Sequence, residues 1–195
     1  MILEQKRITQ LRRLQRIIGV EFEDLLLLNE AFIHPSYANE QDFTQNDNQR
    51  LEFLGDAVLE LAISHYLYGQ DQELTEGQMT RIRALAVCET SLAKVSRKLS
   101  LGDFLILGKG EEHTGGRVKS SILADVFEAL VGAIFIERGH RDADDFIIKN
   151  LSTTINSAVK GDLTEDYKTM LQELLQKHSP AGGTFLVVLL LMIIT

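Results

Sequence analysis

Two segments of this chain are apolar on nearly every side at helical period, yet each carries two carboxylates one helical turn apart. The segments and their acids are residues 49–68 with Glu52 and Asp56, and residues 122–139 with Asp125 and Glu128. A helix that is apolar all round packs inside a protein rather than on its surface. The pattern therefore predicts a helical core that contains both segments and holds four acids within it or at its edge.

Helical periodicity continues along the rest of the chain, and no run before residue 160 alternates at period two. The other expected helices cover residues 4–18, 23–33, 140–159, and a unit from Thr75 to Gly102 with a break near Cys88–Thr90. Proline, which interrupts helices, occurs only twice. We therefore predict an all-α fold with few or no strands before residue 160.

Turn and capping residues mark the expected boundaries. Pro35 disfavours helix at the preceding residue, so the second helix should end there, and residues 38–48 should form a loop. Asp47 or Asn48 is expected to cap the helix that follows that loop. The glycine-rich residues 107–121 should form a second loop, with Ser120 or Ser121 as the cap of the next helix.

Composition restricts the class of protein. The formal net charge is −8, which on its own argues against a nucleic-acid partner, because phosphate binding relies on Lys and Arg. The single cysteine, Cys88, excludes an internal disulfide and a cysteine-rich metal site. The N-terminus lacks a signal-peptide core, and the apolar run near the C-terminus is shorter than the ~20 residues that span a bilayer. We expect a cytoplasmic protein with no membrane partner.

The four buried acids need counter-charges, and within residues 49–68 and 121–135 Arg50 is the only lysine or arginine. One interpretation is that each acid pairs with an arginine from elsewhere or faces solvent in a groove. The other is a divalent-metal site, because carboxylate and water oxygens are the ligands that Mg²⁺ prefers and a cation relieves their repulsion. Two acid pairs at helical spacing favour the metal site.

Other metal and nucleophile chemistries fit the sequence less well. A di-iron bundle needs Glu-x-x-His pairs that point inward, and the one match, Glu137 with His140, contains Gly139 at a helix end. Zinc is disfavoured by one cysteine and scattered histidines. A serine or cysteine hydrolase would lack a strand–turn setting for its nucleophile. An all-oxygen set favours Mg²⁺, with Mn²⁺ as a substitute, and two such metals commonly cleave phosphodiesters.

Several motifs resemble the ribonuclease III family. "NQRLEFLGDAVLEL" resembles the family signature, and "LLLLNEAFIHPSYANE", "TEGQMTRIRALAVCETSLA" and "LGKGEEHTGGRVKSSILADVFEALVGAIFIERG" resemble its other blocks. They occur in the family's order over about residues 10–157. The resemblance implies the helical endonuclease domain of that family, at residues 1–158.

The resemblance also implies roles for individual residues. Glu52, Asp56, Asp125 and Glu128 match the family's metal-site acids, and Asp56 and Glu128 match its active-site positions. By the same resemblance, supporting positions are Glu76 and Gln49, and the dimer-interface position is Phe53. Candidate RNA contacts, chosen for their positive charge on the glycine-rich loop, are Lys109, Arg117 and Lys119; the alternative is that these charges are only solvated. Glu76 could equally be an exposed acid in a helix's first turn, and Phe53 could be a core residue.

The family's activity follows as an expectation. A homodimer cleaves double-stranded RNA to 5′-phosphate and 3′-hydroxyl ends by a metal-activated water, in rRNA-precursor and mRNA processing, without a small-molecule cofactor. Gln49 departs from the family, which usually has glutamate there.

The C-terminal region departs further from the family. Residues 159–178 resemble a linker and the first helix of a double-stranded-RNA-binding domain, and residues 179–195 form an apolar tail that does not match it. The alternative is therefore a catalytically weak RNA-binding or dimerising protein, left by loss of that α/β module.

Overall fold

The computed structural model describes residues 3–40, 46–70 and 74–160. The chain divides into two compact units, Met1–Ile155 and Asn156–Thr195, and everything described below concerns the first. Most of the predicted linker and RNA-binding helix, and all of the apolar tail, lie outside the described residues. The predicted domain boundaries therefore stay predictions.

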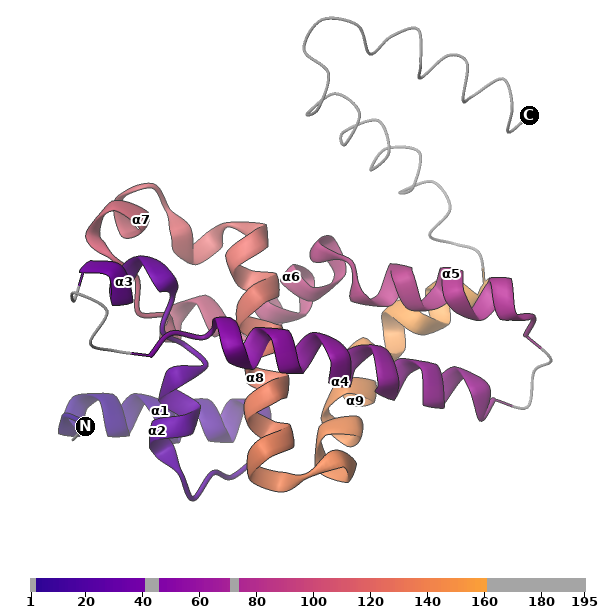
Figure 1. Ribbon diagram of the computed structural model, residues 1–195, viewed down its shortest axis with the longest axis horizontal. Coiled ribbons are helices and arrows are strands. Elements are labelled where there is room, and N and C mark those ends of the chain that lie inside the picture. Colours follow the sequence, from indigo (N-terminus) through magenta and orange to yellow (C-terminus); the bar gives the residue numbers. More distant parts are fainter. Residues whose placement is uncertain (1–2, 41–45, 71–73, 161–195) are drawn as a thin grey trace, which may run out of the picture. The chain divides into compact units, whose positions relative to one another are not determined.

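The described chain is helical throughout (Figure 1). The α-helices are α1 (Gln5–Ile18), α2 (Leu25–Glu30), α3 (Pro35–Glu40), α4 (Gln49–Tyr68), α5 (Glu76–Val87), α6 (Glu89–Lys98), α7 (Lys109–His113), α8 (Ser120–Arg138) and α9 (His140–Lys160). Two short 3-10 helices are η1 (Leu101–Phe104) and η2 (Gly116–Val118). Within the described ranges the only β-type pairing is an isolated bridge between Ile33 and Ile106. The predicted all-α fold is confirmed, and no described helix is long and apolar enough to cross a membrane.

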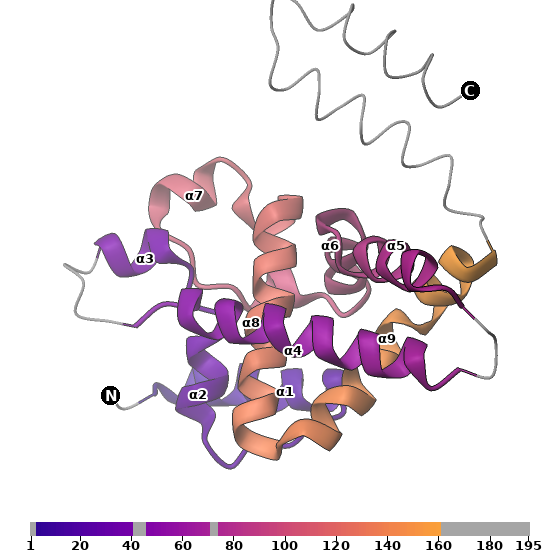
Figure 2. The same ribbon diagram turned by 45° about the vertical axis from the view of Figure 1, so that its right-hand side comes forward.

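Helix α8 is the central element, and its surroundings explain its all-round apolar pattern. Helix α4 crosses it in both views (Figures 1 and 2). On other sides, Phe127 stacks on Phe146 of α9 at 5.8 Å between ring centroids, and Ser96 of α6 donates a hydrogen bond to the Leu123 carbonyl at 2.6 Å. A helix with partners on several sides must be apolar on several sides.

Two glycines let α4 and α8 touch backbone to backbone. A Cβ on Gly55 of α4 would overlap the Glu128 carbonyl oxygen, and a Cβ on Gly132 of α8 would overlap the Leu51 carbonyl oxygen. No larger residue fits at either position without separating the helices. This close approach brings the first half of α4, with its acids, against the first half of α8.

The break in the Thr75–Gly102 unit is confirmed at Cys88, which ends α5 and precedes α6. Thr75 begins α5 in a capping box with Gln78. At the start of α4 the N-cap residue is Asn48, which makes no side-chain cap; the preceding Asp47 instead accepts a hydrogen bond from the Gln49 N–H at 3.0 Å.

Four local predictions were wrong. Residues 23–33 form only the shorter α2, although the predicted break at His34 is confirmed. The loop predicted at residues 38–48 starts too early, because α3 runs from Pro35 to Glu40; a proline at a helix's first position gives up an N–H that has no partner there. Glycine-rich residues 107–121 contain α7 and η2. The residue that precedes α8 is Lys119, which makes no side-chain cap, so neither Ser120 nor Ser121 caps this helix.

Candidate acidic metal centre

The four acids from α4 and α8 form one electrostatic cluster at the helix crossing. The pKa of Glu128 is raised to about 8, by burial first and then by the charges of Asp56, Glu52 and Asp125 in that order. Each of these carboxylates is therefore close enough to repel Glu128. The structure brings together the four residues that the sequence predicted as metal ligands.

Two further acids, Asp47 and Glu89, add to the cluster. The pKa of Glu52 is raised by burial first, and then by the charges of Asp125, Asp47 and Asp56. The pKa of Asp125 is raised by burial and by Glu89, at the start of α6. The sequence interpretation missed both, because they come from other elements and have no periodic relation to the four acids.

Cationic side chains do not balance this cluster within the described chain. None of the four carboxylates forms an ion pair or side-chain hydrogen bond with a described residue, and Arg50 is exposed. Asp56 is exposed, while Glu52, Asp125 and Glu128 are half-buried. The interpretation in which each acid pairs with an arginine is therefore excluded for the described part of the chain.

The four side chains have the right chemistry for a metal ion, but they are not arranged around one position. All four groups are carboxylates, which suit a hard divalent cation. Among the described residues, however, no three acidic, histidine or cysteine side chains form a ready-made cage. The raised pKa values of Glu52, Asp125 and Glu128 come from burial and mutual repulsion, and a bound cation would relieve both.

The other predicted residues of α4 and α5 lie in different places. Gln49 is exposed, one turn before Glu52. Glu76 is exposed at the first position of α5 and lines an apolar groove of about 540 Å³ with Leu61 and Tyr68, near the C-terminal end of α4. Within this chain the structure does not bring Glu76 into the acidic cluster, and its role stays a prediction.

Phe53 is not a core residue. Its side chain is 82% exposed, and Leu61 and Tyr68 on the same helix are 56% and 82% exposed. These three residues, here called the α4 apolar face, would bury substantial surface if a partner covered them.

The glycine-rich segment carries the three predicted RNA contacts, and two of them have partners. Arg117 binds both carboxylate oxygens of Glu112 at 2.7 and 2.6 Å and also the carbonyls of Gly102 and Leu105. Lys119 donates to Glu111 and Thr114. Lys109 is exposed at the start of α7. Arg117 thus holds the loop together, whatever else it binds.

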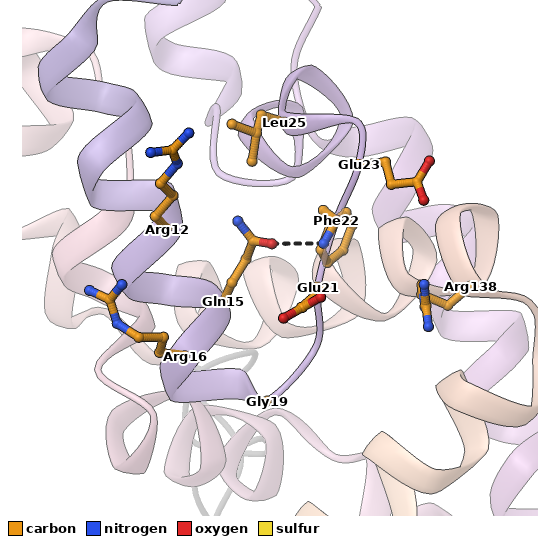
Figure 3. A pocket seen from close by; sticks show the side chains of 9 residues that line it. All are labelled: Arg12, Gln15, Arg16, Gly19, Glu21, Phe22, Glu23, Leu25 and Arg138. Atoms are coloured by element: carbon orange, nitrogen blue, oxygen red, sulfur yellow. Dashed lines mark hydrogen bonds between the residues drawn. The ribbon is translucent and has the colours of Figure 1, made fainter.

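A larger groove of about 650 Å³ lies elsewhere, between α1, the 19–25 loop and the end of α8 (Figure 3). Arg12 and Arg16 of α1 and Arg138 of α8 line it, and the Gln15 side chain accepts a hydrogen bond from the Phe22 N–H at 2.7 Å. None of the four acids lines this groove. The acidic centre is therefore marked by its chemistry and not by cavity size.

Known proteins resemble this chain over most of its length. A family described as Ribonuclease-III-like matches residues 24–155. A Ribonuclease 3 of Pelotomaculum thermopropionicum is 51% identical over 171 residues, which are 87% of this chain and 70% of that protein. A Ribonuclease 3 of Clostridium perfringens is 46% identical over 164 residues, with 84% and 69% covered.

Solved structures agree with the sequence relatives. The crystal structure of the nuclease domain of ribonuclease III from Campylobacter jejuni matches with a TM-score of 0.67 and 38% identity, over 73% of this chain and 93% of that one. A second structure of that domain, described by its flexibility in a region involved in dimer formation, matches with a TM-score of 0.66 and 40% identity, over 72% and 97%. This chain therefore belongs to the ribonuclease III family of endoribonucleases.

Proposed function

We propose that this chain hydrolyses phosphodiester bonds of double-stranded RNA at the acidic centre, leaving 5′-phosphate and 3′-hydroxyl ends. One observation supports the proposal above others. Four carboxylates lie on two helices that touch at Gly55 and Gly132, and no described cation balances them. Such a cluster destabilises the fold unless a bound cation compensates its negative charge.

The residues fit a divalent cation. Glu52, Asp56, Asp125 and Glu128 would hold Mg²⁺, with Mn²⁺ as a substitute, since carboxylates suit both ions. Bound there, the cation supplies an activated water and stabilises the leaving oxygen in phosphodiester hydrolysis. It also offsets negative charge at the centre, which weakens the objection raised by the net charge of −8.

The chain's own residues prepare the centre for this cation. Close packing of α4 on α8 fixes the backbones that carry the acids, so side-chain rotation without backbone movement would gather the carboxylates around a cation. With a pKa of about 8, Glu128 holds a proton at neutral pH when no cation is present, and it releases that proton when a cation binds. Asp56, the exposed member, faces solvent from which substrate approaches.

The partners follow from surfaces beside the centre. The α4 apolar face, which includes Phe53, would pair with a second copy of the chain to form a homodimer with two centres. Lys109 and, where their acidic partners allow it, Arg117 and Lys119 would meet phosphates. Duplex RNA is recognised mainly by shape and backbone, which fits a centre without base-reading groups. Processing of rRNA precursors and mRNA in the cytoplasm is the proposed setting.

The decisive experiment compares wild type with Glu128→Gln on a long RNA duplex and on single-stranded RNA, in Mg²⁺ and then Mn²⁺. Wild type should cut only the duplex, and the variant should lose at least about 100-fold in rate, because an amide is a poorer cation ligand than a carboxylate. Glu60→Gln, which makes the same change at an exposed acid of α4, is the matched control. If wild type binds the duplex but cuts it in neither metal, the weak RNA-binding alternative is correct.

A further inference from the structure

The turn that connects α2 to α3 carries a chain of hydrogen bonds that the acidic centre does not explain. The Gly108 N–H donates to Ser36 Oγ at 2.9 Å, and Ser36 Oγ lies 2.8 Å from His34 Nδ1. The Ser36 N–H also donates to His34 Nδ1, at 3.2 Å. Since Ser36 Oγ accepts from Gly108, its own proton is free to be donated to the imidazole.

These bonds fix the tautomer of His34. A ring nitrogen that accepts a backbone N–H carries no proton, so the proton of the neutral ring lies on Nε2. Burial lowers the pKa of His34, which keeps the ring neutral at pH 7. Among the described residues, Nε2 has no hydrogen-bond partner, and the ring is only half-buried. The turn thus presents one neutral N–H donor with a defined direction.

The same turn is bound to the start of α4. The Asn48 N–H donates to the Ile33 carbonyl at 2.9 Å, and the Asn48 carbonyl accepts from the Glu52 N–H at 2.9 Å. His34 therefore follows a residue that contacts the first turn of α4, where Glu52 lies. The charge of Asp47 acts on both His34 and Glu52, which places these two side chains around a common neighbour.

On its other side the turn is bound to the glycine-rich segment by the Gly108 N–H, and the His34 N–H donates to the carbonyl of Ile106, just before that segment, at 3.0 Å. The charged groups that act on His34 are Glu111, Asp47 and Lys119. Glu111 is neutralised by its ion pair with Lys119, and Asp47 accepts the Gln49 N–H at the N-terminus of α4. His34 thus lies between the acidic centre and the predicted RNA-contact segment.

We propose that His34 is a substrate-binding residue, whose Nε2–H donates a hydrogen bond to a phosphate oxygen of the RNA strand that enters the acidic centre. Ser36 is its positioning residue, because it holds the tautomer in which Nε2 carries the proton. This inference rests on the proposed function. A neutral donor suits this place, because it contacts phosphate without adding a cation that would compete with the metal for the four carboxylates.

Paired variants at His34 test the donor. His34→Leu removes the N–H but keeps comparable bulk, whereas His34→Gln offers an amide N–H at a similar distance from the backbone. His34→Leu should weaken duplex binding, measured without divalent cation, and raise KM by about 10-fold with kcat within about twofold. His34→Gln should stay within about threefold of wild type. His113→Leu, an exposed histidine on α7, is the matched control.

The salt dependence of binding separates this donor from a cation. Because a neutral N–H releases no counterion, His34→Leu should leave the slope of log affinity against log salt unchanged. A slope reduced by about 0.7–0.9 would mean that a charged contact was lost, and would overturn the assignment. Equal losses in His34→Leu and His34→Gln would also overturn it, because they would indicate a structural role alone.

The tautomer can be read without any variant at His34. A long-range proton–nitrogen spectrum of the wild-type protein should show the Nε2–H form, with the Nε2 resonance shifting when duplex RNA is added. Ser36→Ala removes the hydroxyl but keeps the backbone N–H that Nδ1 accepts, so it should keep the Nε2–H form, orient the ring less firmly and give an intermediate KM. An Nδ1–H form in wild type would overturn the proposal. If wild type cuts duplex RNA but His34→Leu has unchanged KM, only the His34 assignment fails. If wild type neither binds nor cuts, the proposed function itself fails.

Discussion

Among the individual residues, Glu128 carries the clearest cost in stability, because its carboxylate is ionised with difficulty in the folded protein. Its pKa of about 8 means that ionising it in the folded protein, with no cation present, is unfavourable. The causes, burial first and then three neighbouring acids, are features of the assembled centre. The unfolded chain has neither, so the folded and unfolded states bind protons differently.

The pH dependence of stability follows with a definite sign. Between the ordinary value of 4.5 and about 8, folded Glu128 binds more protons than the unfolded chain, so the metal-free protein should lose stability as pH rises through this range. Glu128→Gln should flatten this loss and be more stable than wild type at pH 8 by about 1–2 kcal/mol after solvent screening. Urea unfolding at pH 5 and pH 8 in a chelator measures both effects. Equal pH slopes in the two proteins would contradict the assignment, and Glu60→Gln should match wild type.

Gln49 is the residue at which this chain departs from the pattern of its family, and it lies exposed one turn before Glu52. Glutamine keeps the length and one acceptor oxygen of glutamate but lacks its charge. Gln49→Glu should therefore lower the Mg²⁺ concentration for half-maximal cleavage by about two- to fivefold, with little change in maximal rate. Titration of cleavage rate with Mg²⁺ measures the difference. Superimposable titration curves would show that position 49 has no part in cation binding.

At the scale of the element, the contact of α4 with α8 positions the four acids. Each helix places its own two acids by periodicity, but the distance between the pairs depends on how closely the helices approach. Gly55 and Gly132 allow backbone contact, because any Cβ there would overlap a carbonyl oxygen of the other helix. The apolar side chains around them then bury the crossing.

Gly55→Ala tests this contact directly. The added methyl would overlap the Glu128 carbonyl, which is backbone and cannot move alone, so the helices must separate. We expect destabilisation of about 2–4 kcal/mol and a loss of Mg²⁺-dependent cleavage larger than the loss of folded protein. Thermal unfolding and a Mg²⁺ titration measure the two effects. Gly77→Ala in α5, where a Cβ would contact nothing, is the control and should be neutral or slightly stabilising. A fully active Gly55→Ala would mean that the crossing tolerates a wider spacing.

At the scale of the whole molecule, two features need a partner. The α4 apolar face is exposed in the single chain, and the net charge of −8 is unfavourable for binding a polyanion. A second copy of the chain would cover the α4 apolar face, and bound cations would offset the negative charge at the acidic centre. Neither feature counts against a nuclease once the assembled, cation-loaded protein is considered.

The dimer prediction belongs at this scale. Phe53→Ala should raise the dimer dissociation constant at least about tenfold, because an exposed aromatic side chain is a frequent source of interface energy. Sedimentation across a concentration series measures the change. Val118→Ala, which shortens a 71% exposed side chain on η2, should leave association unchanged. A wild-type chain that stays monomeric at high concentration would refute the dimer.

The sequence was enough to predict most helices, the break at Cys88 and the helices that carry the four acids. A helix depends on contacts within one turn, so its periodicity can be read from neighbouring residues. The sequence did not predict that α3 begins at Pro35, because proline is common both at the first position of a helix and just after a helix ends. It also did not predict α7 and η2 in the glycine-rich segment, because such short helices show no measurable periodicity.

Only the tertiary structure decided which acids meet and which residues support them. Asp47 and Glu89 add charge, and His34, Ser36 and Gly108 form a hydrogen-bonded chain, yet none is related to the four acids by any spacing. Arg117, expected to reach towards RNA, binds the carbonyls of Gly102 and Leu105, just before the glycine-rich segment. Contacts of this kind join residues that are distant in the chain, and they form only when the elements pack against one another. Such contacts cannot be predicted from local periodicity, because periodicity describes one helix at a time.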